Sequence, residues 1–264
     1  MSNLFFFGGK GWKLPIICIH LYLYLNKTDM TEERKQSERI QTSILNAAEK
    51  KALTWLAWRQ PKWMTSDILT FIGFLGAVII AVGYALSNLN VAWIWLASFG
   101  FVVNWYGDSL DGTYARVHNQ QRKTYGFFID HNVDCINEAL MFIGLGLSPM
   151  MNMHISLMVL VAYLILSIYV YISAHLKNEF KLTYAKMGPT ELRIIVIIVN
   201  TLYFFIKPFQ EFAVTVHVFH NEISLGIMDF VGIVVLIALI IVYLNSLRVD
   251  AREYAKMDPL IKHE

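Results

Sequence analysis

Long apolar runs dominate the chain between residues 67 and 247. They cover residues 67–87, 89–107, 127–147, 155–175, 190–207 and 226–247. Most of them reach the roughly 20 residues that a helix needs to cross a bilayer. Thr65-Ser66-Asp67 supplies a helix start before the first run, and Pro208 ends the fifth. The pattern therefore predicts an all-α integral membrane fold with about six transmembrane helices, and we assign residues 67–247 to this domain.

The segment before the first run has a different pattern. Within residues 30–66, apolar side chains recur at helical spacing over residues 31–59, while Glu and Lys fill the other face. This is typical of an amphipathic helix at a membrane interface, although a helix packed on soluble protein has the same pattern. Residues 1–29 hold only a short apolar run, and Met30 resembles an ordinary start, so we expect an N-terminal extension outside the fold. Residues 248–264 are expected to form a C-terminal tail.

Lys and Arg alternate from one connection to the next along the six runs. Ten of them precede the first run, three lie between the second and third, and three lie between the fourth and fifth, whereas the first and third connections have none. Because cytoplasmic loops are enriched in these residues, both termini and the second and fourth loops should be cytoplasmic. An even number of spans agrees with this orientation.

The composition fits a membrane protein and argues against some other classes. Of the 264 residues, 56% are hydrophobic and 16% are charged, whereas a soluble domain has about 25% charged residues. The net charge of +2 does not indicate a nucleic-acid partner, so membrane lipids are the expected surroundings. The two cysteines, Cys18 and Cys135, lie far apart in apolar stretches and predict neither a disulfide framework nor a zinc site.

Four aspartates stand out because they lie at the ends of apolar runs. Asp108 and Asp111 are three residues apart at the end of the second run, and Asp130 and Asp134 are four apart at the start of the third. On helices, each spacing places both side chains on one face. Carboxylates at membrane depth are costly unless they are paired, hydrated or bound to cations. Oxygen ligands without His or Cys favour Mg²⁺, Mn²⁺ or Ca²⁺, and two such ions can clamp a phosphoryl transfer.

The stretch around these aspartates resembles the signature of the CDP-alcohol phosphatidyltransferase family, D-x-x-D-G-x-x-A-R followed by a spacer and G-x-x-x-D-x-x-x-D. The fixed positions are Asp108, Asp111, Gly112, Ala115, Arg116, Gly126, Asp130 and Asp134. The resemblance implies that the four aspartates hold a two-metal Mg²⁺ or Mn²⁺ site, with Asp134 as general base. It also implies that Asp111, Gly112, Ala115, Arg116 and Gly126 bind the CDP-linked donor, and that the protein can form a homodimer.

Two details resemble the choline/ethanolamine phosphotransferase branch, which uses CDP-choline or CDP-ethanolamine with diacylglycerol. His131 directly follows Asp130, with Asn137 beyond it, and Gly188-Pro189-x-Glu191 opens the fifth run. If this likeness holds, His131 competes with Asp134 as the base, because a His takes up a proton near neutral pH. A hydrogen-bonded supporting role is the alternative for His131. Eukaryotic proteins of that branch are longer and have more spans.

Arg193 indicates a different acceptor. It lies one turn into the fifth run, where an Arg is a functional candidate, and it could bind the phosphate of an acceptor such as inositol phosphate or glycerol phosphate. Lys186 and Glu191 are further acceptor-binding candidates. A structural contact of Arg193 with Glu191 or another carboxylate, or extension of its side chain to the interface, is the alternative.

The sequence therefore predicts an enzyme of phospholipid synthesis that transfers a phosphatidyl or phospho-alcohol group from a CDP-linked donor to an alcohol hydroxyl and releases CMP, at the cytoplasmic face of the membrane. A cation channel or transporter is the main rival, because acids within a membrane also mark ion pathways. A structural membrane protein is a second rival. Ion conduction does not need the Gly-x-x-Ala-Arg insert, and all fixed positions of the motif are present.

Overall fold

The computed structural model describes residues 38–40, 45–177, 179–181, 188–218 and 221–259. Its contacts divide the chain into Met1–Gln36 and Ser37–Glu264, and the described residues all belong to the second unit. The extension expected at residues 1–29 therefore lies outside the described residues, as do residues 260–264 of the predicted C-terminal tail. Residues 248–257 of that tail continue the last helix.

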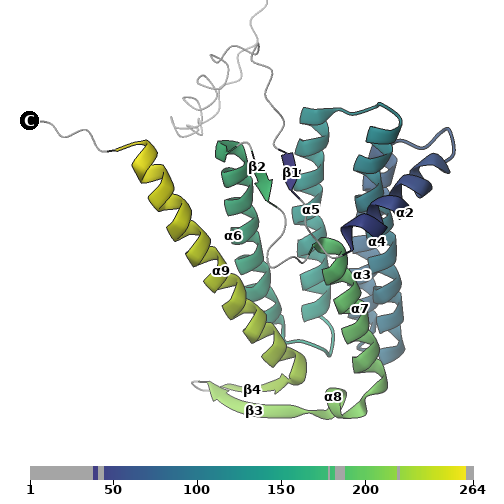
Figure 1. Cartoon of the computed structure of the whole chain (residues 1–264). Coiled ribbons are helices and arrows are strands. Elements are labelled where there is room, and N and C mark those ends of the chain that lie inside the picture. Colours follow the sequence, from purple (N-terminus) through teal and green to yellow (C-terminus); the bar gives the residue numbers. More distant parts are fainter. Residues whose placement is uncertain (1–37, 41–44, 178, 182–187, 219–220, 260–264) are drawn as a thin grey trace, which may run out of the picture. The chain divides into compact units, whose positions relative to one another are not determined.

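Each of the six apolar runs forms a helix, as predicted (Figure 1). The helices are α3 (Ser66–Leu86), α4 (Ile94–Val117), α5 (Lys123–Gly146), α6 (Met153–Lys177), α7 (Pro189–Phe205) and α9 (Ile227–Met257). Three of them, α3, α6 and α9, are long and apolar enough to cross a membrane, whereas α4 and α5 carry the polar residues of the site and α7 has 17 residues. Many large apolar side chains point outward from these helices, including Phe71, Ile168 and Val234. These features confirm the prediction of an all-α membrane fold with six long helices.

The second helix differs from its predicted bounds. The Asn90 side chain accepts a hydrogen bond from the amide of Ala92 and caps a short 3-10 turn, η1 (Val91–Trp93), so the α-helix starts at Ile94 and not at residue 89. At its other end α4 continues to Val117, about ten residues beyond the apolar run. The added turns are polar, and they carry the first half of the aspartate motif on a rigid helix.

Helices α3 and α4 approach very closely through glycines. A Cβ atom on Gly107 of α4 would lie 2.6 Å from the Cα of Gly73 on α3, and a Cβ on Gly76 would lie 2.6 Å from the Cα of Asn104. Asn104 also donates a hydrogen bond to the carbonyl of Gly73 at 2.9 Å. Small residues permit this backbone contact, and it fixes Asp108, next to Gly107, against α3.

The predicted interfacial helix is shorter than the sequence indicated. Helix α2 covers Asn46–Trp58, and residues 38–40 form a strand, β1 (Glu38–Ile40), that pairs in parallel with β2 (Glu179–Lys181). Helix α2 packs against α4, with Leu53 and Ala57 buried (Figure 1). Trp55 and Trp58 remain exposed, which is the arrangement expected of aromatic side chains at a membrane interface. The location of α2 on a membrane surface stays a prediction.

The connection between the fifth and sixth long helices contains structure that was not predicted. A short helix, α8 (Lys207–Glu211), is followed by an antiparallel hairpin of β3 (Ala213–Val218) and β4 (Asn221–Gly226). The alternating β-branched residues of β3 favour a strand. Figure 1 shows the hairpin at the end of the bundle where α7 stops and α9 begins. The all-α prediction missed this element, because a six-residue alternation is a weak signal beside the long runs.

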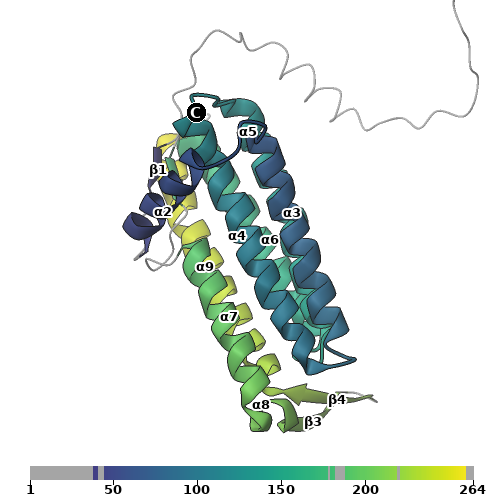
Figure 2. The same ribbon diagram turned by 90° about the vertical axis from the view of Figure 1, so that its right-hand side faces the viewer.

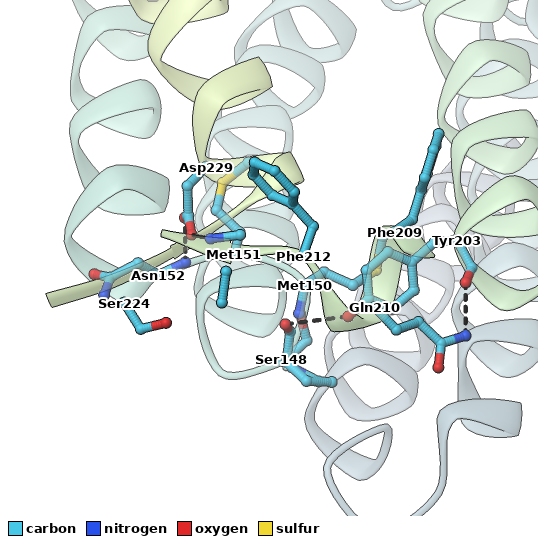
Figure 3. A pocket seen from close by; sticks show the side chains of 13 residues that line it. Ser148, Met150, Met151, Asn152, Tyr203, Phe209, Gln210, Phe212, Ser224 and Asp229 are labelled. Atoms are coloured by element: carbon cyan, nitrogen blue, oxygen red, sulfur yellow. Dashed lines mark hydrogen bonds between the residues drawn. The ribbon is translucent and has the colours of Figure 1, made fainter. Parts of the chain in front are cut away.

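A pocket of about 250 Å³ lies beside this hairpin (Figure 3). Its walls include Ser148, Met150, Tyr203, Phe212 and Asp229. Asp229 accepts hydrogen bonds from the backbone amides of Asn152 at 2.6 Å and Gly226 at 2.7 Å, so its carboxylate holds the surrounding turns together. Ser148 lies just after the end of α5 and is 14 residues beyond Asp134, which lies near the start of that helix. At the rise of an α-helix, this separation corresponds to about 20 Å. The pocket is therefore at the opposite end of the bundle from the aspartate motif.

Candidate active site

Three aspartates from two helices meet in one place. Asp108 projects from α4, and Asp130 and Asp134 project from α5, one turn apart. One carboxylate oxygen from each lies within 4.8 Å of the other two. All three residues are half-buried, so water screens their mutual repulsion only in part. This arrangement of hard oxygen ligands fits a divalent cation such as Mg²⁺ or Mn²⁺.

A basic side chain also reaches this group. Arg193, in the first turns of α7, donates from Nη2 to Oδ2 of Asp108 at 2.5 Å and from Nε to Oδ1 of Asn104 at 3.1 Å. Its Nη1 atom is buried and has no hydrogen-bond partner among the described residues. Helix α4 contacts both α7 and α3, and Figure 2 shows it between them, which explains how α7 can deliver a guanidinium to a residue of α4. Arg193 thus makes the carboxylate contact that the sequence offered as one alternative.

Asp111 is the fourth aspartate of the motif, and its carboxylate points toward α3. Thr70 of α3 donates a hydrogen bond to its Oδ2 at 2.6 Å, and the amide of Gly112 donates to its Oδ1. Asp111 is 8% exposed and interacts electrostatically with Asp130 and Asp108, so it borders the group of three without belonging to it. Its predicted role as a metal ligand stays a prediction.

The residues predicted to bind the nucleotide lie mostly on the last turns of α4. Ala115 is buried, and Arg116 donates from Nη2 to the Thr113 hydroxyl at 2.9 Å. A Cβ on Gly112 would lie 3.4 Å from Arg116 Nη1, so the guanidinium folds back along the helix past this glycine. Gly126, on the first turn of α5, is exposed and a Cβ there would meet nothing within 4 Å. The predicted contact of these residues with the donor stays a prediction.

The loop that joins the two halves of the motif is anchored to α3. Arg122 donates a hydrogen bond to Asp67 in the first turn of α3 and packs over the ring of Tyr125. The hydrogen bond to Asp67 raises the pKa of the Arg122 guanidinium above its ordinary value, so the guanidinium stays charged. The anchor holds the start of α5, and with it Asp130, near α3.

His131 packs against aromatic rings at the edge of the site. Its Nδ1 lies 2.8 Å from the carbonyl oxygen of Phe127 and 3.9 Å from Asp130 Oδ2. The ring centroid is 4.1 Å from that of Phe127 and 4.6 Å from that of Tyr171. The carbonyl requires a proton on Nδ1, which leaves Nε2 as the nitrogen that could accept one. This geometry is compatible with both the base and the supporting role.

Glu191 contacts the residues at the start of both α7 and α2, and its predicted role in acceptor binding stays a prediction. Its Oε2 accepts the amide of Gly188, which caps α7, and its Oε1 accepts the amide of Leu45 at the start of α2, each at 3.0 Å. Glu49 of α2 accepts further hydrogen bonds from Thr190 and Trp105. These contacts join α2 to α7. Lys186, the other acceptor-binding candidate, lies outside the described residues.

Several polar residues of the site were not singled out from the sequence. Glu138 lies one turn beyond Asp134 on the same face of α5, and Tyr163 of α6 donates a hydrogen bond to its carboxylate. Asn104 lies one turn before Asp108 on α4. The four-residue spacings from the motif aspartates were the available signal for Glu138 and Asn104. Tyr163 had none, because its contact depends on how α6 packs against α5.

Known proteins match this chain over the same region. Residues 63–247 match the family model of the CDP-alcohol phosphatidyltransferases. Phosphatidylinositol phosphate synthase of Cutibacterium acnes is 32% identical over 84 residues, which cover 32% of this chain and 38% of that protein. Archaetidylinositol phosphate synthase of Pyrococcus horikoshii is 30% identical over 98 residues, which cover 37% and 49%. The matched segments span less than half the length of either relative. The family match, in contrast, covers most of this chain and confirms the resemblance seen in the aspartate motif: the chain belongs to the CDP-alcohol phosphatidyltransferase family.

Proposed function

We propose that this protein transfers a phosphatidyl or phospho-alcohol group from a CDP-linked donor to the hydroxyl of an acceptor and releases CMP. The observation that carries the proposal is the meeting of Asp108, Asp130 and Asp134 within 4.8 Å, on the motif of a family that uses such donors. The hydroxyl oxygen forms a bond to the β-phosphorus of the donor. The bond from that phosphorus to the bridging oxygen breaks, and its electrons leave with CMP. The hydroxyl proton passes to Asp134 or His131.

The three aspartates, with Asp111 beside them, are the residues that would hold Mg²⁺ or Mn²⁺. Bound ions would neutralise charge on the pyrophosphate and on the attacking and leaving oxygens. Carboxylates this close together repel one another, and a divalent cation relieves this repulsion better than the single contact of Arg193 with Asp108.

We further propose a phosphorylated polyol as the acceptor. Arg193 supports this, because its unpartnered Nη1 can still donate to a phosphate oxygen. The two relatives support it as well, since the names of both describe inositol phosphate synthases. The comparisons give no support to the choline/ethanolamine branch that His131 and Glu191 suggested. The alternation of Lys and Arg along the chain supports an active site at the cytoplasmic face, with both termini on that side. A homodimer also remains part of the proposal.

The test measures CMP release by the full chain in membranes, with CDP-diacylglycerol as donor and inositol phosphate as acceptor, with Mg²⁺ or Mn²⁺ and after treatment with a chelator. Asp108→Asn and Asp130→Asn should each abolish release, and the chelator should do the same to the wild type. Asp229→Asn is the matched control, since it alters a buried aspartate at the far end of the bundle and should keep turnover. A wild type that releases no CMP with CDP-diacylglycerol, CDP-choline or CDP-ethanolamine would favour a channel or transporter.

A further inference from the structure

Three buried polar atoms around the carboxylates have no hydrogen-bond partner in the described part of the chain. They are Arg193 Nη1, Asn137 Oδ1 and Glu138 Oε2. A buried polar atom without a partner costs about 1–3 kcal/mol, so such atoms are uncommon and need an explanation. One of the three is a donor and two are acceptors, and all belong to residues beside Asp108 or Asp134. This clustering indicates a ligand that completes their hydrogen bonds.

The two acceptors extend the site deeper into the bundle. Asn137 and Glu138 lie three and four residues beyond Asp134, so their side chains project from the same face of α5. Asn137 is 5% exposed. Four residues of helix rise roughly 6 Å, which is a distance that one small molecule can bridge. A ligand that reaches Asp134 can therefore also reach Glu138.

Tyr163 of α6 holds the Glu138 carboxylate on its other side. Its hydroxyl donates to Glu138 and interacts electrostatically with Asp134, Arg193 and Asp108. Glu138 itself interacts with Asp108 in the same way. The pair thus belongs to the polar centre shared by α4, α5, α6 and α7, and it fixes the carboxylate in one orientation with Oε2 left to accept a further donor.

The chemistry of this position favours a hydroxyl over a cation. Glu138 does not join the three aspartates whose oxygens lie within 4.8 Å of one another. A neutral hydroxyl supplies the missing donor to Glu138 or Asn137 without adding charge. We propose that Glu138, oriented by Tyr163, is a specificity-determining residue that accepts a hydrogen bond from a second hydroxyl of the acceptor, beyond the hydroxyl that is phosphatidylated. The inference rests on the proposed function and defines the acceptor as polyhydroxylated.

The experiment compares two acceptors that differ in their number of hydroxyls. The full chain in membranes, with CDP-diacylglycerol and Mn²⁺, is given inositol phosphate or 2-hydroxyethyl phosphate, which has one hydroxyl. Glu138→Met removes the acceptor atoms at similar side-chain length. It should raise the KM for inositol phosphate on the order of ten- to hundredfold, since hydrogen bonds to charged groups are strong, and leave the KM for the donor and for 2-hydroxyethyl phosphate within about twofold. Tyr163→Phe should act in the same direction by a smaller factor.

Two controls separate this role from others. Tyr84→Phe removes another buried tyrosine hydroxyl, one that donates to Asn200 at 3.0 Å, and should leave every KM unchanged. Mn²⁺ affinity, measured by electron paramagnetic resonance, should fall at most several-fold in Glu138→Met, because the variant removes a negative charge near the aspartates. A loss of Mn²⁺ affinity as large as that in Asp130→Asn would make Glu138 a metal ligand and overturn the proposal.

An unchanged KM for inositol phosphate in Glu138→Met, or equal increases for both acceptors, would also overturn it. If Glu138→Met fails to insert or fold, Glu138→Gln serves instead, because it loses the charge that makes the proposed hydrogen bond strong and should raise the KM for inositol phosphate by a smaller factor. An unchanged KM in that variant would overturn the proposal too. Absence of CMP release by the wild type would remove the proposed function and this inference together, whereas normal wild-type turnover with an unaffected variant would remove the inference alone.

Discussion

The guanidinium of Arg193 lies on Asp108, with Nη2 2.5 Å from the carboxylate Oδ2. The contact joins α7 to α4 and places a positive charge on one member of the group that we propose to bind cations. Both side chains are largely enclosed, with 16% and 22% exposure, so their charges are only partly screened. The same guanidinium therefore has two opposite electrostatic effects: it repels a metal ion and it attracts an anionic substrate.

Removal of Arg193 should strengthen metal binding in the absence of substrate. Arg193→Ala abolishes a positive charge beside the aspartates, so we expect the Kd for Mn²⁺ to fall several-fold, measured by electron paramagnetic resonance of free Mn²⁺. Arg59→Ala removes an exposed arginine that packs over the ring of Trp55, outside the aspartate group, and should leave the Kd unchanged. Weaker Mn²⁺ binding in Arg193→Ala would show instead that the arginine is needed to shape the site.

The same variant tests the phosphate contact. Arg193→Ala should raise the KM for inositol phosphate at least tenfold while the KM for CDP-diacylglycerol changes little, because a charge-assisted hydrogen bond to the acceptor is lost. Arg193→Lys keeps the positive charge but lacks the planar guanidinium, so its KM for inositol phosphate should lie between those of the wild type and Arg193→Ala. An unchanged acceptor KM in Arg193→Ala would restrict Arg193 to its structural contact with Asp108.

The hydrogen bond from Thr70 to Asp111 should matter for turnover. Thr70→Val keeps the shape of the side chain and removes the hydroxyl that fixes the Asp111 carboxylate at 2.6 Å, so kcat/KM should fall roughly tenfold. Thr201→Val is the matched control, because the Thr201 hydroxyl donates only along its own helix, to the carbonyl of Ile197, and its loss should have little effect. Equal rates for Thr70→Val and the wild type would mean that Asp111 does not need this orientation.

The parts of the fold that could be predicted are those with a regular sequence pattern. Six apolar runs correspond to six helices, and the four-residue spacing of Asp130 and Asp134 placed both on one face. The hydrophobic pattern could not reveal that α4 continues past residue 107, because its last turns are polar and are held by contacts with α3 such as Thr70 with Asp111. It also held no sign that Glu191 would join α7 to α2, since that contact spans 146 residues of sequence.

Distance along the chain explains what was missed in the site as well. Asp108, Asp111, Asp130 and Asp134 form a compact motif, so their association was visible in the sequence. Tyr163 comes from α6, and nothing in the local sequence marks it. Arg193, of α7, was a candidate with a carboxylate contact as one alternative, but the sequence did not indicate that the carboxylate would be that of Asp108. Only the packing of four helices brings Tyr163 to Glu138 and Arg193 to Asp108.

His131 should support the site without acting as its base. Its Nδ1 faces the Phe127 carbonyl, and its ring packs between Phe127 and Tyr171, which fixes it at the edge of the aspartate group. We therefore expect His131→Gln to lower kcat by less than about tenfold and Asp134→Asn to lower it by at least a hundredfold, in line with loss of a general base. Single-turnover measurements of CMP release test this. Comparable losses of kcat in the two variants would return His131 to the role of base.

The close contact of α3 and α4 should determine the stability of the whole site. Gly107→Ala places a Cβ 2.6 Å from the Cα of Gly73, so the helices must separate, and the free energy of unfolding should fall by about 1–3 kcal/mol or more. Thermal unfolding of the protein in detergent measures this. Gly126→Ala adds the same methyl group where nothing lies within 4 Å and should not lower the midpoint, because Ala favours a helix over Gly. A Gly107→Ala protein as stable as the wild type would show that the backbones of α3 and α4 are further apart than described, and Asp108 would then lose its fixed position against α3.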